Sequence, residues 1–182
     1  MNQPKLLVYC SLFPSKKRPN AGVFIRERMF RVGKNIPIIV VSPVPWFPLQ
    51  GIIRYWRPHF RPQPEKYEMQ QGVQVYFPRF LSIPGLFKSW DGFFMALGSL
   101  PTLMKLKHEF NIIDAHFAYP DGYAATLLAK WLKKPVTITL RGTEVPLSKM
   151  HGRKIRMIKA INSATRVFSV ADSLKQYVGN LG

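Results

Sequence analysis

The sequence predicts an α/β protein built on a doubly wound, mainly parallel sheet with helices on both faces. Six short runs rich in β-branched residues alternate with longer segments whose apolar residues recur at helical spacing. Most of these runs are apolar at nearly every position, as strands buried between two helix layers are. A chain of 182 residues that is 47% apolar is long enough for one such domain with its own core. Strands and helices alternating at this spacing favour right-handed crossovers, as in Rossmann-like domains.

The individual elements follow from the periodicity in chain order. The predicted strands are residues 6–10, 36–42, 73–77, 112–115, 136–140 and 167–170. The predicted helices are residues 23–35, 90–110, 122–133, 153–162 and 171–181. The third strand reads Val-Gln-Val-Tyr-Phe, and this alternation predicts a more peripheral place in the sheet. We expect Asn20 to cap the first helix and Asp172 to cap the last one.

One segment interrupts the alternation of strands and helices. Residues 43–85 hold half of the 16 prolines together with several aromatic residues, which predicts a functional or mobile excursion from the domain. The chain otherwise reads as a single domain over residues 1–182. Its last residues, 179–182, add no closing element, which we interpret as a cut; a frayed natural terminus is the alternative.

The charge of the chain is strongly positive. It carries 27 Lys and Arg against 9 Asp and Glu, a net charge of +18. Such a balance indicates an anionic partner: a nucleic acid, a phosphorylated small molecule or an acidic membrane surface. A single cysteine, Cys10, rules out an internal disulfide and fits a reducing compartment; we expect a buried structural thiol. Because the sequence has neither a signal-peptide pattern nor an apolar run of ~20 residues, we expect a cytoplasmic protein or one on the cytoplasmic face of a membrane.

The loop after the first strand is a candidate phosphate-binding loop. Gly22 would let the backbone approach phosphate oxygens at the N-terminus of the following helix, which carries partial positive charge. The loop contains no G-x-G-x-x-G, which disfavours a dinucleotide cofactor, and no G-x-x-x-x-G-K-[ST], which excludes a P-loop. An ordinary turn is the alternative interpretation of a single glycine at this position.

Two further loops follow the fourth and fifth strands, whose carboxyl ends should share one edge of the sheet. In the fourth strand Asp114 and His116 lie on one face by alternation, and His116 stands at the carboxyl end. Its imidazole could donate to a sugar hydroxyl or phosphate, exchange a proton near pH 7, or be satisfied by nearby carbonyls. After the fifth strand, Arg141 could bind phosphate or carboxylate and Glu144 could accept from a hydroxyl-rich ligand; a surface ion pair is the alternative.

Other catalytic chemistries find no support in the pattern. The sequence offers no nucleophile elbow and no carboxylate pair of the kind that glycosidases use. The histidines are scattered and the lone cysteine has no partner, so we expect no metal site; these residues are His59, His108, His116, His151 and Cys10.

Taken together, the loops resemble those of a known family, the retaining family-four (group 1) glycosyltransferases, in their amino-terminal domain. The matching motifs are Phe-Pro at 13–14 with Pro-Asn-Ala-Gly-Val-Phe at 19–24, His116 with Pro-Asp-Gly at 120–122, and Arg-Gly-Thr-Glu at 141–144. Ser-Val-Ala-Asp-Ser-Leu at 169–174 is similar to the last stretch before the family's interdomain crossing. The third motif departs in one position, since family members commonly carry Asp where Glu144 stands.

The resemblance implies a GT-B fold, two Rossmann-like domains facing across a cleft, of which this chain would be the acceptor-side half. It implies transfer of a sugar from a nucleotide-sugar donor to a cell-envelope, lipid-linked or polysaccharide acceptor with retention of configuration, without a metal or other cofactor. The carboxyl-terminal domain, which holds most of the nucleotide site, is absent, so the 182 residues alone should be inactive. By resemblance, His116 is the catalytic residue beside the transferred sugar, and Gly22 and Ala21 lie at the donor diphosphate. The implied substrate-binding residues are Asn20, Asp121, Gly122, Arg141, Gly142, Thr143 and Glu144.

The basic charge leaves a second interpretation open. On a helical wheel Ile155, Ile158 and Ile161 form one stripe of the helix at 153–162, which predicts the buried face of that helix. The basic residues around it could be a solvated face or a peripheral membrane surface; they are Lys149, Arg153, Lys154, Arg156, Lys159 and Arg166. The aromatic and basic residues of 46–61 and 86–90 could act as interfacial anchors. The alternative function is a stand-alone binding domain for an anionic membrane or a nucleic acid; the latter has charge alone in its favour.

Overall fold

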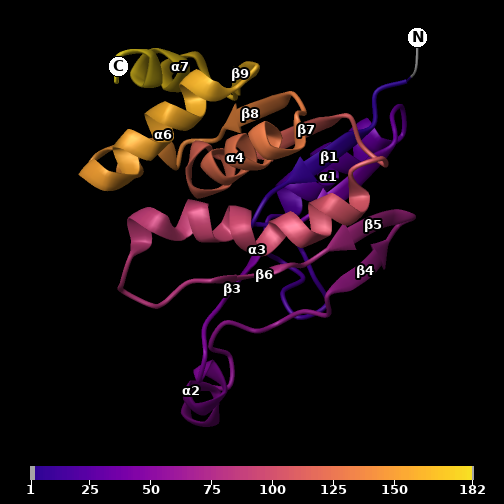
Figure 1. Cartoon of the computed structure of the whole chain (residues 1–182), viewed down its shortest axis with the longest axis vertical. Coiled ribbons are helices and arrows are strands. Elements are labelled where there is room, and N and C mark those ends of the chain that lie inside the picture. The colour runs from indigo at the N-terminus through magenta and orange to yellow at the C-terminus, as the bar shows by residue number, and fades with distance from the viewer. Residues whose placement is uncertain (1–2, 182) are drawn as a thin grey trace.

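A computed structural model describes residues 3–181, and its centre is a seven-stranded sheet with the strand order β4-β5-β2-β1-β7-β8-β9 (Figure 1). Every neighbouring pair is parallel except β4 with β5. This confirms the predicted α/β class with a mainly parallel sheet, and each of the six predicted strands is present. The strands are β1 (Leu6–Tyr9), β2 (Ile38–Val41), β4 (Tyr67–Gln70), β5 (Val73–Tyr76), β7 (Ile112–His116), β8 (Val136–Leu140) and β9 (Arg166–Ser169).

Helices cover both faces of the sheet. The five predicted helices are present as α1 (Val23–Gly33), α3 (Asp91–Leu106), α4 (Tyr123–Leu132), α6 (His151–Ser163) and α7 (Asp172–Gly179). The sequence analysis did not predict α2 (Gln50–Trp56), α5 (Glu144–Ser148) or the short turns η1 (Lys88–Trp90) and η2 (Ala118–Gly122).

The central strand β1 shows why these runs are apolar at every position. Leu6 and Val8 belong to the core beneath α1, whereas Leu7 and Tyr9 belong to the core beneath α3, α4, α6 and α7. All four side chains are buried, because each face of the strand packs against a helix layer. Cys10, which follows the strand, is buried among the residues of the first of these cores, as the sequence predicts.

The excursion at 43–85 is more structured than its composition suggests. After β2 the chain continues into β3 (Val44–Trp46), which pairs in parallel with β6 (Arg79–Leu81) in a separate two-stranded ribbon. Between these strands, α2 lies apart from the sheet and its helices (Figure 1). The rest of the excursion supplies β4, an antiparallel edge strand, so that β5 is second from the edge. A proline inside β3 and the polar sequence of β4 explain why neither strand was predicted.

Three local predictions are wrong. The N-cap of α1 is Gly22 in a left-handed conformation, and Asn20 lies two residues outside the helix. Asp172 is the first residue of α7, and the extended residue before it is the N-cap. In α6 the buried residues are Met157 and Ala160. Of the three isoleucines, Ile155 is 51% exposed, whereas Ile158 and Ile161 are half-buried and Ile161 packs against the rim of the core. The small Ala160 and the flexible Met157 fit the inward face of α6 better than branched side chains.

Among residues 3–181, no helix combines the length and the apolar content needed to cross a bilayer.

Candidate functional site

The carboxyl edge of the sheet brings the three predicted loops together. On one side of β1 lie the strands β2, β5 and β4. On its other side lie the later strands β7, β8 and β9. The boundary between β1 and β7 is therefore a topological switch point, where the loops diverge and leave a crevice. Tyr9 is in register with Ala115, and His116 with Thr139, so the loops that follow these strands start at nearly the same level.

Gly22 forms the junction between the first loop and α1. Its φ angle is 65°, and a Cβ atom at this position would lie 2.0 Å from the backbone oxygen of Leu12. Both facts admit only glycine, since a left-handed conformation is unfavourable for other residues and the neighbouring atom is backbone. The first N–H groups of the helix have no partner within the helix and point out of its start.

His116 and Arg141 form the central contact of the site. The Nε and Nη2 atoms of Arg141 lie 3.2 and 3.1 Å from the imidazole Nδ1 of His116. Because the guanidinium can only donate, Nδ1 is the acceptor and the imidazole proton sits on Nε2. The guanidinium also lies over the ring of Phe24 in the first turn of α1, 5.3 Å from the ring centroid. Arg141 therefore joins the loop after β8 to β7 and to α1.

The Nε2 atom of His116 is the unsatisfied group of this cluster. It is buried and has no hydrogen-bond partner among the residues that the structure describes. The nearest acidic atom, Oδ2 of Asp114, is 3.7 Å away, which is too long for a hydrogen bond. Asp114 instead accepts from the hydroxyl of Thr137 at 2.6 Å. A buried N–H without a partner is unfavourable, so an acceptor introduced here would be stabilised.

Electrostatics keep His116 neutral. Burial lowers its pKa to about 3, and the positive charges of Arg141 and Arg28 contribute to the shift. Near pH 7 the imidazole is therefore neutral and donates from Nε2. This favours the predicted role as a hydrogen-bond donor over the predicted role in proton exchange. Its side chain is fully buried beneath its neighbours. A ligand could reach the imidazole of His116 only after a neighbouring group moves. Arg141, which is half-buried and bonded to Nδ1, is such a neighbour.

Asp121 ties the second loop to the first. Its carboxylate accepts the backbone N–H of Ser11, and the hydroxyl of Ser11 donates to Oδ2 at 3.1 Å. Burial raises the pKa of Asp121 to about 7, although the hydrogen bonds from Ser11 act in the opposite direction. The adjacent Gly122 is also buried, and a Cβ atom there would lie 2.8 Å from the backbone oxygen of Phe117. Asp121 and Gly122 are therefore buried beneath the surface of this edge and hold the loops together.

Glu144 ties the second loop to the third. Oε1 accepts the backbone N–H of Ala118 at 3.0 Å, and Oε2 accepts those of Arg141 at 3.2 Å and Gly142 at 2.7 Å. The side chain is fully buried. Its carboxylate thus positions the backbone of two loops, and no Arg–Glu ion pair forms between the side chains of the third motif within the described part of the chain.

The predicted residues therefore divide into two groups. An inner group holds the loops in place: Gly22, His116, Asp121, Gly122 and Glu144 are all buried. An outer group lines the surface of the edge: Asn20, Gly142 and Thr143 are exposed, and Ala21 and Arg141 are half-buried. Ligand contact in this conformation is open to the outer group, and to the backbone N–H groups at the start of α1.

Comparison of the sequence with curated proteins finds one from Bacillus subtilis (strain 168) that is assigned as the teichuronic acid biosynthesis glycosyltransferase TuaC. The two are 27% identical over 179 residues, which cover 94% of this chain and 45% of that protein. This chain is homologous to a glycosyltransferase. It spans less than half the length of that relative. No family model matches the sequence.

Solved structures confirm the fold. Sucrose-phosphate synthase from Thermosynechococcus elongatus matches 98% of this chain with a TM-score of 0.62 at 9% identity, over 45% of its own length. HepE from Anabaena, in complex with UDP-glucose, matches 100% of this chain with a TM-score of 0.56 at 13% identity, over 41% of its own length. A UDP-GlcNAc 2-epimerase from Methanocaldococcus jannaschii matches 97% of it with a TM-score of 0.56 at 14% identity, over 42% of its own length. The chain thus has the fold of one Rossmann-like domain of a GT-B protein.

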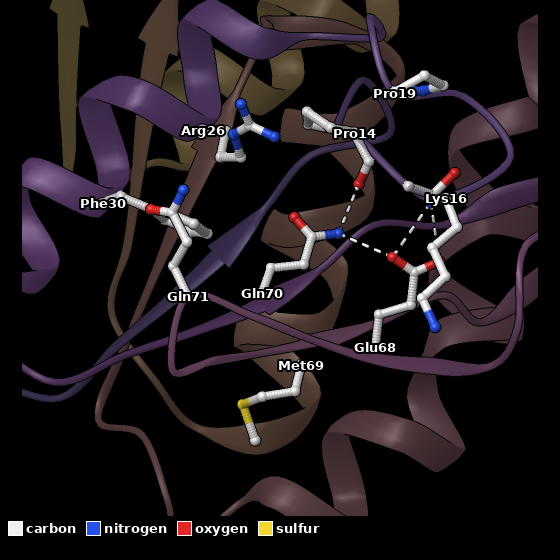
Figure 2. Close-up of a pocket in the computed structure, with 10 residues that line it drawn as sticks. Pro14, Lys16, Pro19, Arg26, Phe30, Glu68, Met69, Gln70 and Gln71 are labelled. Atoms are coloured by element: carbon white, nitrogen blue, oxygen red, sulfur yellow. Dashed lines mark hydrogen bonds between the residues drawn. The ribbon is translucent and has the colours of Figure 1, made fainter.

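A hollow of about 260 Å³ lies beside the first loop, away from the predicted residues (Figure 2). Figure 2 shows the carboxylate of Glu68 and the amide of Gln70, both on β4, pointing to the backbone of this loop. Glu68 accepts the N–H of Lys16 at 3.1 Å, and Gln70 donates to the oxygen of Pro14 at 3.0 Å. These contacts fasten the loop to the edge strand. None of the predicted site residues lines this hollow. The candidate site is therefore the open carboxyl edge of the sheet and not the hollow.

Two contributors to the site were not predicted. Ser11 partners Asp121, and Phe24 lies beneath Arg141. Ser11 had a detectable signal, as a polar residue directly after a buried strand, whereas Phe24 reads as an ordinary exposed residue of an amphipathic helix. Within residues 3–181, no group of three or more His, Cys, Asp or Glu side chains could hold a metal ion.

The buried carboxylate of Glu144 provides a test of this arrangement. We expect Glu144→Gln to lower the free energy of unfolding by about 2–4 kcal/mol, because an amide NH₂ would face at least one backbone N–H and leave it unpaired. Urea denaturation followed by circular dichroism measures this change. The control is Glu27→Gln, whose partner Arg26 is its sequence neighbour on the surface, and which should stay within about 0.5 kcal/mol. Equal effects of the two substitutions would contradict the positioning role.

Proposed function

We propose that this chain is the amino-terminal, acceptor-side domain of a retaining glycosyltransferase that transfers a sugar from a nucleotide-sugar donor. The observation that carries the proposal is the homology to a glycosyltransferase along 94% of the chain. The complex of HepE with UDP-glucose, on a similar fold, supports a nucleotide sugar as the donor class. The acceptor that we propose is a cell-envelope glycan or a lipid-linked sugar, presented at the cytoplasmic face of the membrane.

The residues at the carboxyl edge of the sheet could stabilise the negative charge of a leaving nucleoside diphosphate. Gly22 and Ala21 would bring the N-terminus of α1 to the diphosphate, where its N–H groups stabilise negative charge. Arg141 would turn from His116 to a phosphate oxygen, to which a guanidinium donates two hydrogen bonds. His116, released from Arg141 at Nδ1, would stay neutral and hydrogen-bond to a hydroxyl of the transferred sugar. Asn20 and Thr143 are exposed where acceptor hydroxyls would lie.

A second domain would complete the donor site. The chain spans 45% of its glycosyltransferase relative, which leaves room for a domain of similar size in that protein. The edge strand β9 also exposes apolar side chains, with Phe168 52% exposed. We propose that a carboxyl-terminal domain supplies the remaining contacts to the nucleotide and that no metal or other cofactor takes part.

Arg141→Gln tests the proposed chemistry. Using the complete open reading frame, a panel of nucleotide sugars and a glycan acceptor, we expect the substitution to lower kcat/KM by about 10–100-fold. One lost charge-assisted contact to phosphate corresponds to about 1.5–3 kcal/mol. Arg31→Gln, exposed in the last turn of α1 at the end away from Gly22, is the matched control and should leave kcat/KM unchanged.

The same assay tests the stereochemistry. Proton NMR of the first product formed distinguishes retention from inversion at the anomeric carbon, and an inverted product would refute the retaining assignment. Absence of sugar transfer or donor hydrolysis across the whole panel would favour the alternative, a binding domain without catalysis.

A further inference from the structure

Four large and strongly exposed apolar side chains gather on the segment that projects farthest from the sheet. Leu49, Ile52, Tyr55 and Trp56 are 73%, 52%, 85% and 73% exposed, and all four belong to α2 or immediately precede it. In Figure 1, α2 stands beyond the ribbon of β3 and β6, separated from the body of the domain. We call residues 49–57 the α2 tip. Apolar residues concentrated on one projection indicate an interaction surface rather than scattered surface variation.

The chain around the α2 tip carries basic side chains and no acidic ones, and Asp91 is an acidic group that acts on Arg61 from a different segment. The sequence has no Asp or Glu between Glu27 and Glu65. Arg54 donates from Nε to the backbone oxygen of Phe60 at 3.2 Å, and Arg61 donates to that of Ser82, which fixes both guanidinium groups at the base of the tip. Arg57 is exposed at its end. Arginine flanking Trp and Tyr is the combination found where a protein meets the headgroups of a bilayer.

A second apolar segment leaves the ribbon at the same end. Because β3 and β6 run parallel, the chain exits both strands in the same direction, into the α2 tip from β3 and into residues 82–90 from β6. In this second segment Leu86 and Phe87 are 56% and 66% exposed. The ribbon therefore directs two exposed apolar segments, each followed by basic residues, away from the sheet.

The ribbon also fixes the direction of these segments relative to the site. β2 continues through 42–43 into β3, and β5 continues through 77–78 into β6. Both connections leave the carboxyl ends of their strands, the edge that carries Gly22, His116 and Arg141. The α2 tip thus projects from the same edge of the sheet as the candidate site.

We infer that the α2 tip, together with Leu86 and Phe87, is an interfacial anchor that binds the protein to an anionic bilayer. Charge complementarity selects this partner over a second copy of the chain, because two copies would each bring a net charge of +18 to the contact. Basic residues near an anionic leaflet contribute about 1 kcal/mol each, to which insertion of apolar side chains adds. Resting on the proposed function, the inference narrows the acceptor to one anchored in the same bilayer.

Vesicle co-sedimentation tests the anchor. The purified protein is mixed at low salt with vesicles of phosphatidylcholine and phosphatidylglycerol, or of phosphatidylcholine alone, without donor or acceptor. We expect binding to the anionic vesicles, and about tenfold or greater weakening by Tyr55→Ala with Trp56→Ala. The matched control is Tyr67→Ala with Trp131→Ala, two residues 41% and 40% exposed on other elements, which should change binding less than about twofold.

Each contrary outcome overturns the inference. No binding of the parent protein to anionic vesicles excludes a membrane anchor, and equal binding by the α2-tip and control variants places the contact elsewhere, for example on α6. If the α2-tip variant alters the sedimentation coefficient without vesicles, the segment mediates self-association instead. The proposed function fails separately: Arg141→Gln should retain vesicle binding, and the α2-tip variant should retain transfer to a water-soluble acceptor.

Discussion

The variant Asp121→Asn should lose stability steeply on acidification, by about 4 kcal/mol between pH 6.5 and pH 3 from His116 alone. The pKa of His116 falls from its ordinary 6.5 to about 3 in the folded protein. Between these values the unfolded chain holds a proton on this imidazole that the folded chain does not. The folded state is therefore favoured at higher pH, and its free energy of unfolding decreases by about 1.4 kcal/mol for each unit of acidification.

In the parent protein Asp121 masks this slope. Its pKa rises from 3.8 to about 7 on folding, so between these values the folded chain holds the extra proton. Its contribution to stability is complete below about pH 4 and is lost as the pH rises towards 7, again by about 4 kcal/mol in total. The two residues thus act with opposite signs over nearly the same range. Asparagine at 121 removes one of them while keeping hydrogen bonds to Ser11.

Denaturation in urea at half-unit pH intervals measures these slopes in four proteins: parent, Asp121→Asn, His116→Gln and the double variant. The double variant is the control for all other titrating groups. We expect a positive slope of stability against pH in Asp121→Asn relative to the double variant, and a negative slope in His116→Gln. If both single variants parallel the double variant, the two groups are not perturbed by folding as the structure implies.

The variant Gly22→Ala should destabilise the protein by about 2–4 kcal/mol and abolish binding at the edge of the sheet. An alanine here combines an unfavourable left-handed backbone with a Cβ atom placed 2.0 Å from the oxygen of Leu12. Neither the helix start nor the preceding loop can keep its position when that overlap is relieved. The N–H groups at the start of α1 would then move relative to Arg141 and Phe24.

Gly72→Ala separates the two causes. Gly72 also has a positive φ angle, 82°, but no atom lies within 4 Å of its added Cβ. It should show only the conformational strain, about 1 kcal/mol. Thermal denaturation compares the two variants, and nucleotide-sugar binding by calorimetry, with the complete reading frame, reports on the edge. A Gly22→Ala protein as stable as Gly72→Ala would show that the loop accommodates the methyl group without displacement.

The central strands and the convergence of the three loops could be predicted because they depend on local patterns. A run apolar at every position specifies a strand covered on both faces, and polar residues at its end specify the ligand edge. The prediction failed where local rules compete with tertiary contacts. Asn20 satisfies the compositional rule for a cap, yet the close approach of Leu12 requires glycine two residues later. Three isoleucines form a regular stripe on α6 in the sequence, yet the side of α6 that packs towards α4 and the core buries Ala160 instead.

The positioning roles within the site were beyond sequence reasoning for a different reason. Glu144 accepts from Ala118, 26 residues earlier, and Asp121 accepts from Ser11, 110 residues earlier. Such contacts depend on which strands are neighbours, and single-sequence patterns do not determine strand order. The polar residue types were visible in the loops. Whether a given carboxylate faces a ligand or a backbone amide was not.

The carboxylate of Glu144 also limits how the protein can diversify. Because one buried side chain holds the backbone of the loops after β7 and β8, a change of length or conformation in either loop disturbs the other. The α2 tip follows β3 and leads through residues 58–66 to the edge strand β4, so it can change in sequence or length without altering the loops after β7 and β8. The fold thus separates a constrained part, which carries the candidate site, from a part that tolerates changes in sequence and length.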